Sequence, residues 1–379
     1  MSTASDPEGS GASVRRIVPG VAAGLAATAM LAVVLSGPIE PLAQGQVMTT
    51  TTSGAVPLPI EGMMPSLSGA TAWLNSPPLS PESLRGKVVV VDFWTYTCIN
   101  WQRSQPYVRA WATRYKDQGL VVIGVHTPEF EFEKSVANIR PALGMFRIDY
   151  PVAVDSDYAI WEAFRNRYWP AVYVVDAKGS IRHHQFGEGD YERTEMVVQQ
   201  LLREAGHSGV GNDAVRVDAR GSEVAADWSN LRSPEAYLGG DRSEGFVSSD
   251  SAAMGKSRSY VAPRALALNH WGLSGDWTVN AGAIVVDKPS ARLVYRFHAR
   301  DVHLVMGPPS PGSSLRFRVL LDGRPPGNAH GADVDEEGNG TATGQRLYQL
   351  IRQPGPIADR TVEIEFLDPG VEAYVFTFG

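Results

Sequence analysis

The chain has 379 residues, of which 43% are hydrophobic, 9% aromatic and 20% charged. This length and composition are typical of a globular protein with about two domains, and they exclude a disordered or collagen-like chain. The net charge of -7 leaves no basic patch. We therefore expect no nucleic-acid partner, because phosphate binding needs clustered Lys and Arg.

The N-terminal region has the pattern of an exported protein. Residues 1–16 form a small, polar tail that ends in two arginines, and residues 17–36 form an uncharged, mostly apolar run. A transmembrane helix needs roughly 20 such residues, and the arginines predict a cytoplasmic tail with everything downstream outside the cytoplasm. A cleaved signal peptide is the alternative, but residues 41–43 put proline where a small residue is expected. We expect a membrane-anchored protein of the cell envelope or periplasm, or a secreted one if the run is cleaved.

The chain contains a single cysteine, Cys98. No internal disulfide can form, although exported proteins commonly contain them, so stability must come from packing. A lone thiol in an oxidising compartment is either buried and inert or exposed for reaction with another molecule.

The first folded region predicts an α/β sandwich. Residues 37–66 are rich in Thr, Gly and Pro and predict a flexible spacer from the membrane. After them, buried-type strands alternate with helices and the pattern ends in a hairpin and a helix, which indicates an α/β domain over residues 67–206. The expected strands are 87–94, 120–125, 171–175 and 180–186, and the expected helices are 99–117, 131–145, 157–167 and 191–205.

The second half of the chain has a different character. Residues 207–260 lose periodicity and become rich in Gly, Ser, Asp and Arg, which predicts a linker with one short helix. Residues 261–379 contain short strand-like runs separated by turns, the pattern of an antiparallel β-sandwich. The expected strands are 284–286, 293–299, 302–306, 315–321, 345–351, 361–366 and 372–378.

Cys98 lies where the first strand runs into a helix. A thiol in the first turn of a helix feels the partial positive charge of the helix N-terminus, which should favour the thiolate and lower the thiol pKa. Glu129, Glu131 and Glu133 follow the second strand near the same end of the sheet, and one of them could tune that pKa, although a solvated helix start also explains them. Neighbouring His183 and His184 point to opposite faces of a strand, so we expect no metal site there.

The stretch Val-Asp-Phe-Trp-Thr-Tyr-Thr-Cys-Ile-Asn at 91–100 resembles the redox segment of thioredoxin-like proteins of the TlpA type. It is most similar to the extracytoplasmic part of DipZ proteins, and the likeness continues through residues 125–130, 168–171 and 186–191. Over residues 67–206 the resemblance implies a thioredoxin fold. The membrane electron-carrier part of DipZ proteins has no counterpart in these residues, so we expect electrons to come from another molecule.

The resemblance also implies residue roles. Cys98 matches the attacking cysteine of the family, and Asp92 matches the buried acid that helps to deprotonate the second cysteine. Pro170 matches the cis-proline that faces the redox site, so Trp169 and Pro170 are expected to hold a substrate backbone. A cis X-Pro bond is rare, about 5% of such bonds, which makes this a sharp prediction. Trp101 stands where the family has its second cysteine.

Because an indole cannot resolve a mixed disulfide, the sequence predicts a monothiol thiol-disulfide oxidoreductase without a cofactor. Its partners would be thiol or disulfide proteins, or a small thiol that resolves Cys98. Two alternatives remain: a redox-inactive binding or scaffold protein, and a one-cysteine peroxidase that forms a sulfenic acid. Asp92 loses its expected role, and a buried, unpaired aspartate should be protonated or hydrogen-bonded.

The C-terminal region also resembles DipZ proteins, through residues 268–271, 275–278 and 297–301. The resemblance implies a sandwich similar to a carbohydrate-binding module, with a glycan as a further partner. Trp271, Trp277 and Tyr348 are the candidates for stacking on a sugar, although most aromatics in a sandwich belong to its core.

Overall fold

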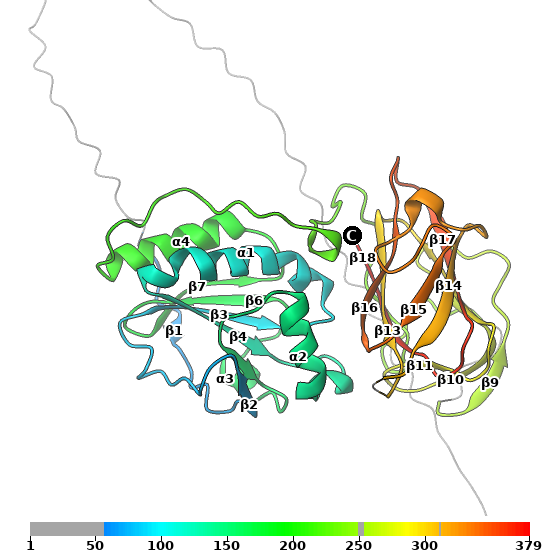
Figure 1. The fold of residues 1–379 in the computed structure, drawn as a ribbon, viewed down its shortest axis with the longest axis horizontal. Helices are drawn as coiled ribbons and strands as arrows, with labels where there is room; N and C mark the ends of the chain where they lie inside the picture. The colour runs from blue at the N-terminus through cyan, green and yellow to red at the C-terminus, as the bar shows by residue number, and fades with distance from the viewer. Residues whose placement is uncertain (1–56, 249–253, 311) are drawn as a thin grey trace, which may run out of the picture. The chain divides into compact units, whose positions relative to one another are not determined.

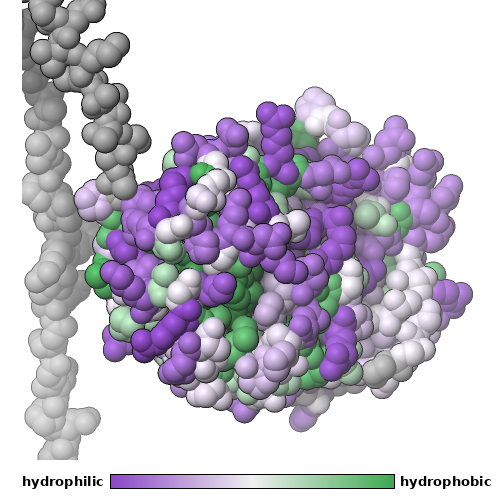
Figure 2. Space-filling model, turned by 60° about the vertical axis from the view of Figure 1, so that its left-hand side comes forward, coloured by the Kyte–Doolittle hydropathy of each residue, from purple (hydrophilic) through white to green (hydrophobic). Residues whose placement is uncertain are grey.

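The computed structural model describes residues 57–248, 254–310 and 312–379. The predicted tail, the membrane anchor and most of the spacer lie outside these residues. Within the described part, no helix is both long and apolar enough to cross a membrane. The face shown in Figure 2 is mostly hydrophilic, and hydrophobic residues appear on it in small groups.

The first domain has the predicted thioredoxin fold. Its sheet has the strand order β1-β7-β6-β3-β4-β5-β2, in which β3, β4 and β5 run parallel and the other neighbours are antiparallel. The strands are β1 (Gly62–Met63), β2 (Ala72–Leu74), β3 (Val88–Trp94), β4 (Leu120–His126), β5 (Val152–Val154), β6 (Ala171–Val175) and β7 (Ser180–Phe186). The helices are α1 (Ile99–Tyr115), α2 (Val136–Met145), α3 (Ala159–Ala163) and α4 (Tyr191–Glu204).

The central strand β3 is buried along its whole length, as its sequence, apolar except for Asp92, predicts. Helices α1 and α4 lie over one face of the sheet and α3 lies over the other (Figure 1). The predicted helix over 131–145 is interrupted: a 3-10 turn covers Glu131–Lys134, and α2 begins only at Val136. This turn directs the Glu133 side chain inward, where its carboxylate accepts hydrogen bonds.

The second domain is the predicted all-antiparallel β-sandwich. Eleven strands form one curled sheet of order β15-β14-β17-β12-β10-β11-β18-β13-β16, in which β8 also pairs with β18 and β9 with β10. The strands are β8 (Ala236–Tyr237), β9 (Ser257–Tyr260), β10 (Trp271–Val279), β11 (Ile284–Val286), β12 (Ala291–Phe297), β13 (Asp301–Gly307), β14 (Leu315–Leu321), β15 (Asn339–Ala342), β16 (Arg346–Arg352), β17 (Arg360–Phe366) and β18 (Glu372–Phe378). The stretch predicted as a linker contributes β8 and β9 to this sheet.

Strand β10 was not predicted, because its Gly and Ser residues resemble a turn. It joins the two halves of the curled sheet: its first half pairs with β12 and its second half with β9 and β11. Gly275 lies at the change, with a positive φ of 88°, and a Cβ there would be 3.0 Å from the backbone of Ala291. The bend therefore requires a residue without a side chain.

Candidate redox site around Cys98

Cys98 is the N-cap of α1 and follows the three-residue loop that leaves β3. Its thiol donates a weak hydrogen bond to the carbonyl oxygen of Trp169, with 3.8 Å between the two heavy atoms. The peptide bond from Trp169 to Pro170 is cis, which confirms the prediction for this bond. The Trp169 indole donates to the Thr127 carbonyl at 3.0 Å and lies against the Trp161 ring. The structure thus brings Cys98, Trp169 and Pro170 together from separate segments of the chain.

Trp101, which replaces the second cysteine of the motif, is fully buried. Its indole N–H donates to Oδ2 of Asp92 at 3.1 Å. The ring stacks on Trp94 with 4.5 Å between centroids, and its neighbour Phe146 meets it edge-on at 5.0 Å. The substitution therefore fills the interior behind Cys98 and gives the buried acid a donor.

Asp92 is a buried acid that is both hydrogen-bonded and easily protonated, as the sequence predicts. Its side chain is completely buried, and Oδ1 has no hydrogen-bond partner among the described residues. Burial raises the pKa of Asp92 to about 7, against the smaller opposing effect of the Trp101 hydrogen bond. Below that pH, Asp92 is mostly protonated.

A second titratable side chain, His126, is buried beside the same aromatic residues. Its ring lies edge-on to Trp94, with 4.7 Å between centroids, and parallel to Tyr96 at 5.7 Å. Burial lowers the pKa of His126 to about 3. The imidazole is therefore neutral at physiological pH and adds no positive charge near Cys98.

Glu133 holds the redox loop, residues 95–97, which precedes Cys98. Its Oε1 accepts from the Thr97 hydroxyl at 2.6 Å and from the Thr97 backbone N–H at 3.3 Å. Its Oε2 accepts from the backbone N–H groups of Glu129 at 2.7 Å and Phe130 at 2.9 Å. One buried carboxylate thus joins the redox loop to the segment after β4.

The pKa expectation for Cys98 is wrong in its direction. The side chain is half-buried, and burial raises its thiol pKa well above the ordinary value; the carboxylates of Glu235 and Glu129 raise it further. Backbone N–H groups of the first turn of α1 do favour the thiolate, but a helix terminus contributes only about 0.3–1 kcal/mol at an accessible site. Loss of solvation outweighs that contribution, so Cys98 is mainly a thiol near neutral pH.

The β-sandwich packs against the helix end that carries Cys98. Ile99 belongs to a buried cluster with Phe130 of the first domain and with Val305, Leu347 and Val375 of the second. Farther along α1, the buried Arg103 donates to the Phe378 carbonyl at 2.8 Å and pairs with Glu188 at 3.0 Å. The second domain therefore borders the candidate site.

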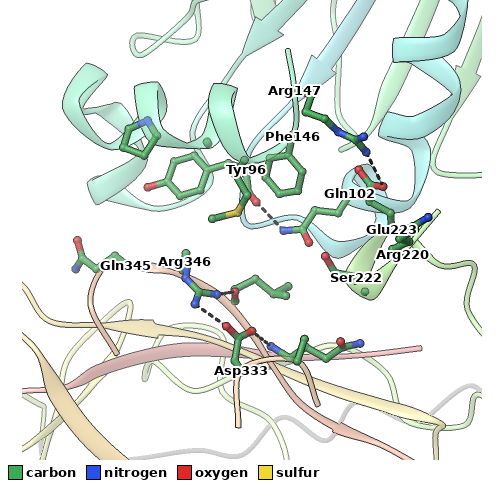
Figure 3. Close-up of a pocket in the computed structure, with 18 of the residues that line it drawn as sticks. Tyr96, Gln102, Phe146, Arg147, Arg220, Ser222, Glu223, Asp333, Gln345 and Arg346 are labelled. Atoms are coloured by element: carbon green, nitrogen blue, oxygen red, sulfur yellow. Dashed lines mark hydrogen bonds and ion pairs between the residues drawn. The ribbon is translucent and has the colours of Figure 1, made fainter. Parts of the chain in front are cut away.

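A pocket of about 640 Å³ lies between the two domains near this contact. Tyr96, Gln102 and Phe146 line it from the first domain, and Arg346 and Asp333 face them from the second (Figure 3). Cys98 is not among the lining residues. The pocket thus lies beside the redox loop and does not contain the thiol.

The predicted sugar-stacking residues do not present a surface. Trp271 is 1% exposed, and Trp277 and Tyr348 are fully buried. All three belong to the core of the sandwich, so the proposal that they stack on a sugar is corrected.

His183 and His184 bond to different partners, Thr194 and Glu61. Among the described residues, no group of three or more His, Cys, Asp or Glu side chains is arranged to hold a metal ion.

The fold and the Cys98 loop define a thioredoxin-fold protein that has one cysteine, Cys98, at the start of α1 and Trp101 three positions later. Two families match the chain: the AhpC/TSA family over residues 67–184 and the thioredoxin-like C-terminal domain over residues 233–379. The thiol-disulfide oxidoreductase YkuV of Bacillus subtilis is 35% identical over 141 residues, which are 37% of this chain and 95% of YkuV. The chain therefore belongs to the thioredoxin-like family of the thiol-disulfide oxidoreductases.

The similarity to DipZ extends over both domains. Protein DipZ of Mycobacterium tuberculosis is 36% identical over 342 residues, which are 89% of this chain and 46% of DipZ. This chain thus spans about half the length of the DipZ proteins that it matches. A solved thioredoxin-like protein in its oxidised form is 35% identical and aligns with 38% of this chain and 97% of its own, with a TM-score of 0.36.

Sequence reasoning missed the contribution of the second domain to this site. Glu235 and Tyr237 lie in a stretch that is predicted to be a linker, and no motif there indicates that Glu235 influences the Cys98 thiol. Of the three glutamates considered as pKa modifiers, Glu129 acts on Cys98, whereas Glu133 has the structural role described above.

Proposed function

We propose that the protein catalyses thiol-disulfide exchange through Cys98 alone, with an external thiol as the resolving group. The observation that carries this proposal is the position of the Cys98 sulfur, 3.8 Å from the Trp169 carbonyl and next to Pro170. Trp169 and Pro170 would hold the substrate backbone against the sulfur. The naming of relatives such as YkuV as thiol-disulfide oxidoreductases supports the same chemistry.

The exchange balances without a redox cofactor. The Cys98 thiol loses its proton to solvent, and the thiolate attacks a substrate disulfide R–S–S–R′. A Cys98–S–S–R bond forms while the S–S bond of the substrate breaks, and R′–S⁻ leaves and takes up a proton. An external thiolate R″–S⁻ then attacks the R sulfur, which forms R–S–S–R″ and releases the Cys98 thiolate. Trp101 takes no part in either step because it has no thiol.

We also propose that this reaction takes place outside the cytoplasm, with the chain anchored by residues 17–36. The arginine pair and the apolar run that follows support this location. The anchored product should remain in the membrane fraction and be released by detergent. Recovery of a shortened chain in the medium would instead indicate cleavage and secretion.

Trapping of the mixed disulfide tests the chemistry. The full chain is incubated with the aromatic disulfide 5,5′-dithiobis(2-nitrobenzoate), and intact mass and thiolate release are followed, with Cys98→Ser as control. We expect one adduct per chain, absent in the control and removed by an added thiol. If the folded chain forms no adduct while the denatured chain does, the protein is a redox-inactive binding protein. If peroxide oxidises Cys98 faster than the disulfide modifies it, the peroxidase alternative replaces the proposal.

A further inference from the structure

A hydrogen-bonded bridge connects the two domains beside the buried cluster that contains Ile99, the residue after Cys98. Tyr237, the last residue of β8, donates its hydroxyl proton to Oε1 of Glu129 across 2.5 Å. The same hydroxyl lies 3.0 Å from Oε2 of Glu235. Because a phenol has one proton, it cannot satisfy two ionised carboxylates at once. Burial and the neighbouring Glu129 carboxylate raise the pKa of Glu235 to about 7. Above that pH both carboxylates are ionised, and the bridge holds negative charge that Tyr237 only partly stabilises.

The chain positions this bridge from both sides of Cys98. On one side, Thr97 is bound by Glu133, which also accepts from the backbone N–H of Glu129. On the other side, Ile99 packs in one cluster with Val375 of β18, the strand residue paired with Tyr237. The residues before and after Cys98 are thus each linked to a member of the bridge.

A single arginine offsets part of the negative charge. Arg242 lies 3.3 Å from Oε1 of Glu129, and its guanidinium lies 3.6 Å from the centre of the Tyr237 ring. Its side chain is 51% exposed, so solvent weakens the attraction. The carboxylates of Glu129 and Glu235 both raise the pKa of the Cys98 thiol, and Glu235 does so fully only above its own pKa of about 7. His126 adds no compensating positive charge, because burial lowers its pKa to about 3.

We propose that Glu129, Glu235 and Tyr237 are positioning residues of the Cys98 site, which set the reactivity of its thiol and make the β-sandwich part of the redox site. The inference rests on the proposed function in taking Cys98 as the reacting group. The bridge disfavours the thiolate, so it slows attack on disulfides near neutral pH. A substrate that displaces Tyr237 or Arg242 from Glu129 would change the electrostatic effect of the Glu129 carboxylate on the Cys98 thiol.

Alkylation of Cys98 by iodoacetamide tests the bridge without requiring any disulfide substrate. The second-order rate constant is measured on the full chain between pH 7 and pH 9, where it follows the thiolate fraction. The double variant Glu129→Gln with Glu235→Gln should react on the order of tenfold faster, the change that corresponds to one pKa unit. Arg242→Gln should react more slowly, by roughly two- to threefold, because it leaves the Glu129 charge uncompensated.

The opposite signs separate charge from loosened packing. If the substitutions only exposed Cys98, the alkylation rate would rise in both variants. That result would overturn the proposal, as would unchanged rates in both. Glu131→Gln is the matched control, because this carboxylate lies on the same loop but is 85% exposed and pairs with Lys134; it should leave the rate unchanged. If the double variant alkylates faster but forms no mixed disulfide, the proposed function fails while the bridge stands.

Discussion

Asp92 and Glu133 are both completely buried acids of the thioredoxin-like domain, yet their surroundings differ. Glu133 accepts four hydrogen bonds, from Thr97, Glu129 and Phe130. Asp92 accepts one, from Trp101, and its second oxygen has no partner among the described residues. Burial raises the pKa of each group, but only Glu133 has several donors that oppose the shift.

The difference indicates what each acid does in this chain. A buried carboxylate with several donors stabilises the segments that donate to it, and its loss leaves those donors unsatisfied. A buried carboxylate with one donor is costly to ionise and stabilises little. Glu133 therefore stabilises the loop before Cys98, whereas Asp92, with its single donor, stabilises its surroundings little.

Trp101→Cys would break this comparison most strongly, because it removes the donor to Asp92 and leaves a cavity. We expect a loss of about 4 kcal/mol in the free energy of unfolding, the usual range for truncating a buried tryptophan, measured by denaturant titration. The variant should also reduce insulin disulfides faster than the parent, because a thiol at position 101, in the first turn of α1 and three positions after Cys98, can resolve the mixed disulfide without an external thiol.

Trp101→Ala is the matched control for that variant. It creates a cavity of similar size without a thiol, so it should lose similar stability and gain no activity. If the cysteine variant is no more active than the alanine variant, the loop no longer presents two thiols in a usable geometry, and the binding-protein alternative is strengthened.

Glu133→Ala tests the other side of the comparison. It leaves buried donors of Thr97, Glu129 and Phe130 without their acceptor, so we expect the free energy of unfolding to fall by about 3 kcal/mol. Glu131→Ala, an exposed neighbour on the same turn, should change it by less than about 0.5 kcal/mol. Equal effects from both variants, measured by the same titration, would show that the hydrogen bonds of Glu133 do not hold the loop.

The sequence predicted best where local pattern and burial agree. The run of β3, apolar except for Asp92, indicated a central strand, and it placed Asp92 in the interior and Cys98 at the start of α1. The predicted cis bond at Pro170 is also present. The motif alone indicated that Trp101 removes the resolving thiol, although it could not show that the indole bonds to Asp92.

The errors arise from contacts between distant segments. The direction of the Cys98 pKa shift depends on burial and on Glu235, which is far away in sequence and belongs to a stretch without periodicity. Strand β10 contains glycines that indicate a turn locally, but the curled sheet uses Gly275 for a bend within the strand. Local patterns do not contain the tertiary contacts that decided these outcomes.

Asp92→Asn gives the smallest of these effects and tests the ionisation of the single-donor acid directly. The pKa of Asp92 is raised from 3.8 to about 7 in the folded chain. Between about pH 4 and pH 7 the native state therefore keeps a proton that the unfolded chain has lost, so rising pH lowers the stability of the parent. Asparagine does not titrate. The stability of the parent relative to the variant should fall by about 2 kcal/mol between pH 5 and pH 6.5.

Asp157→Asn, a change at an exposed aspartate, is the control. Its free energy of unfolding should have the same pH dependence as that of the parent in the same denaturant titrations. If the stability of Asp92→Asn has the same pH dependence as that of the parent, Asp92 is ionised in the folded protein. Its carboxylate would then need further hydrogen-bond donors, as the Glu133 carboxylate has.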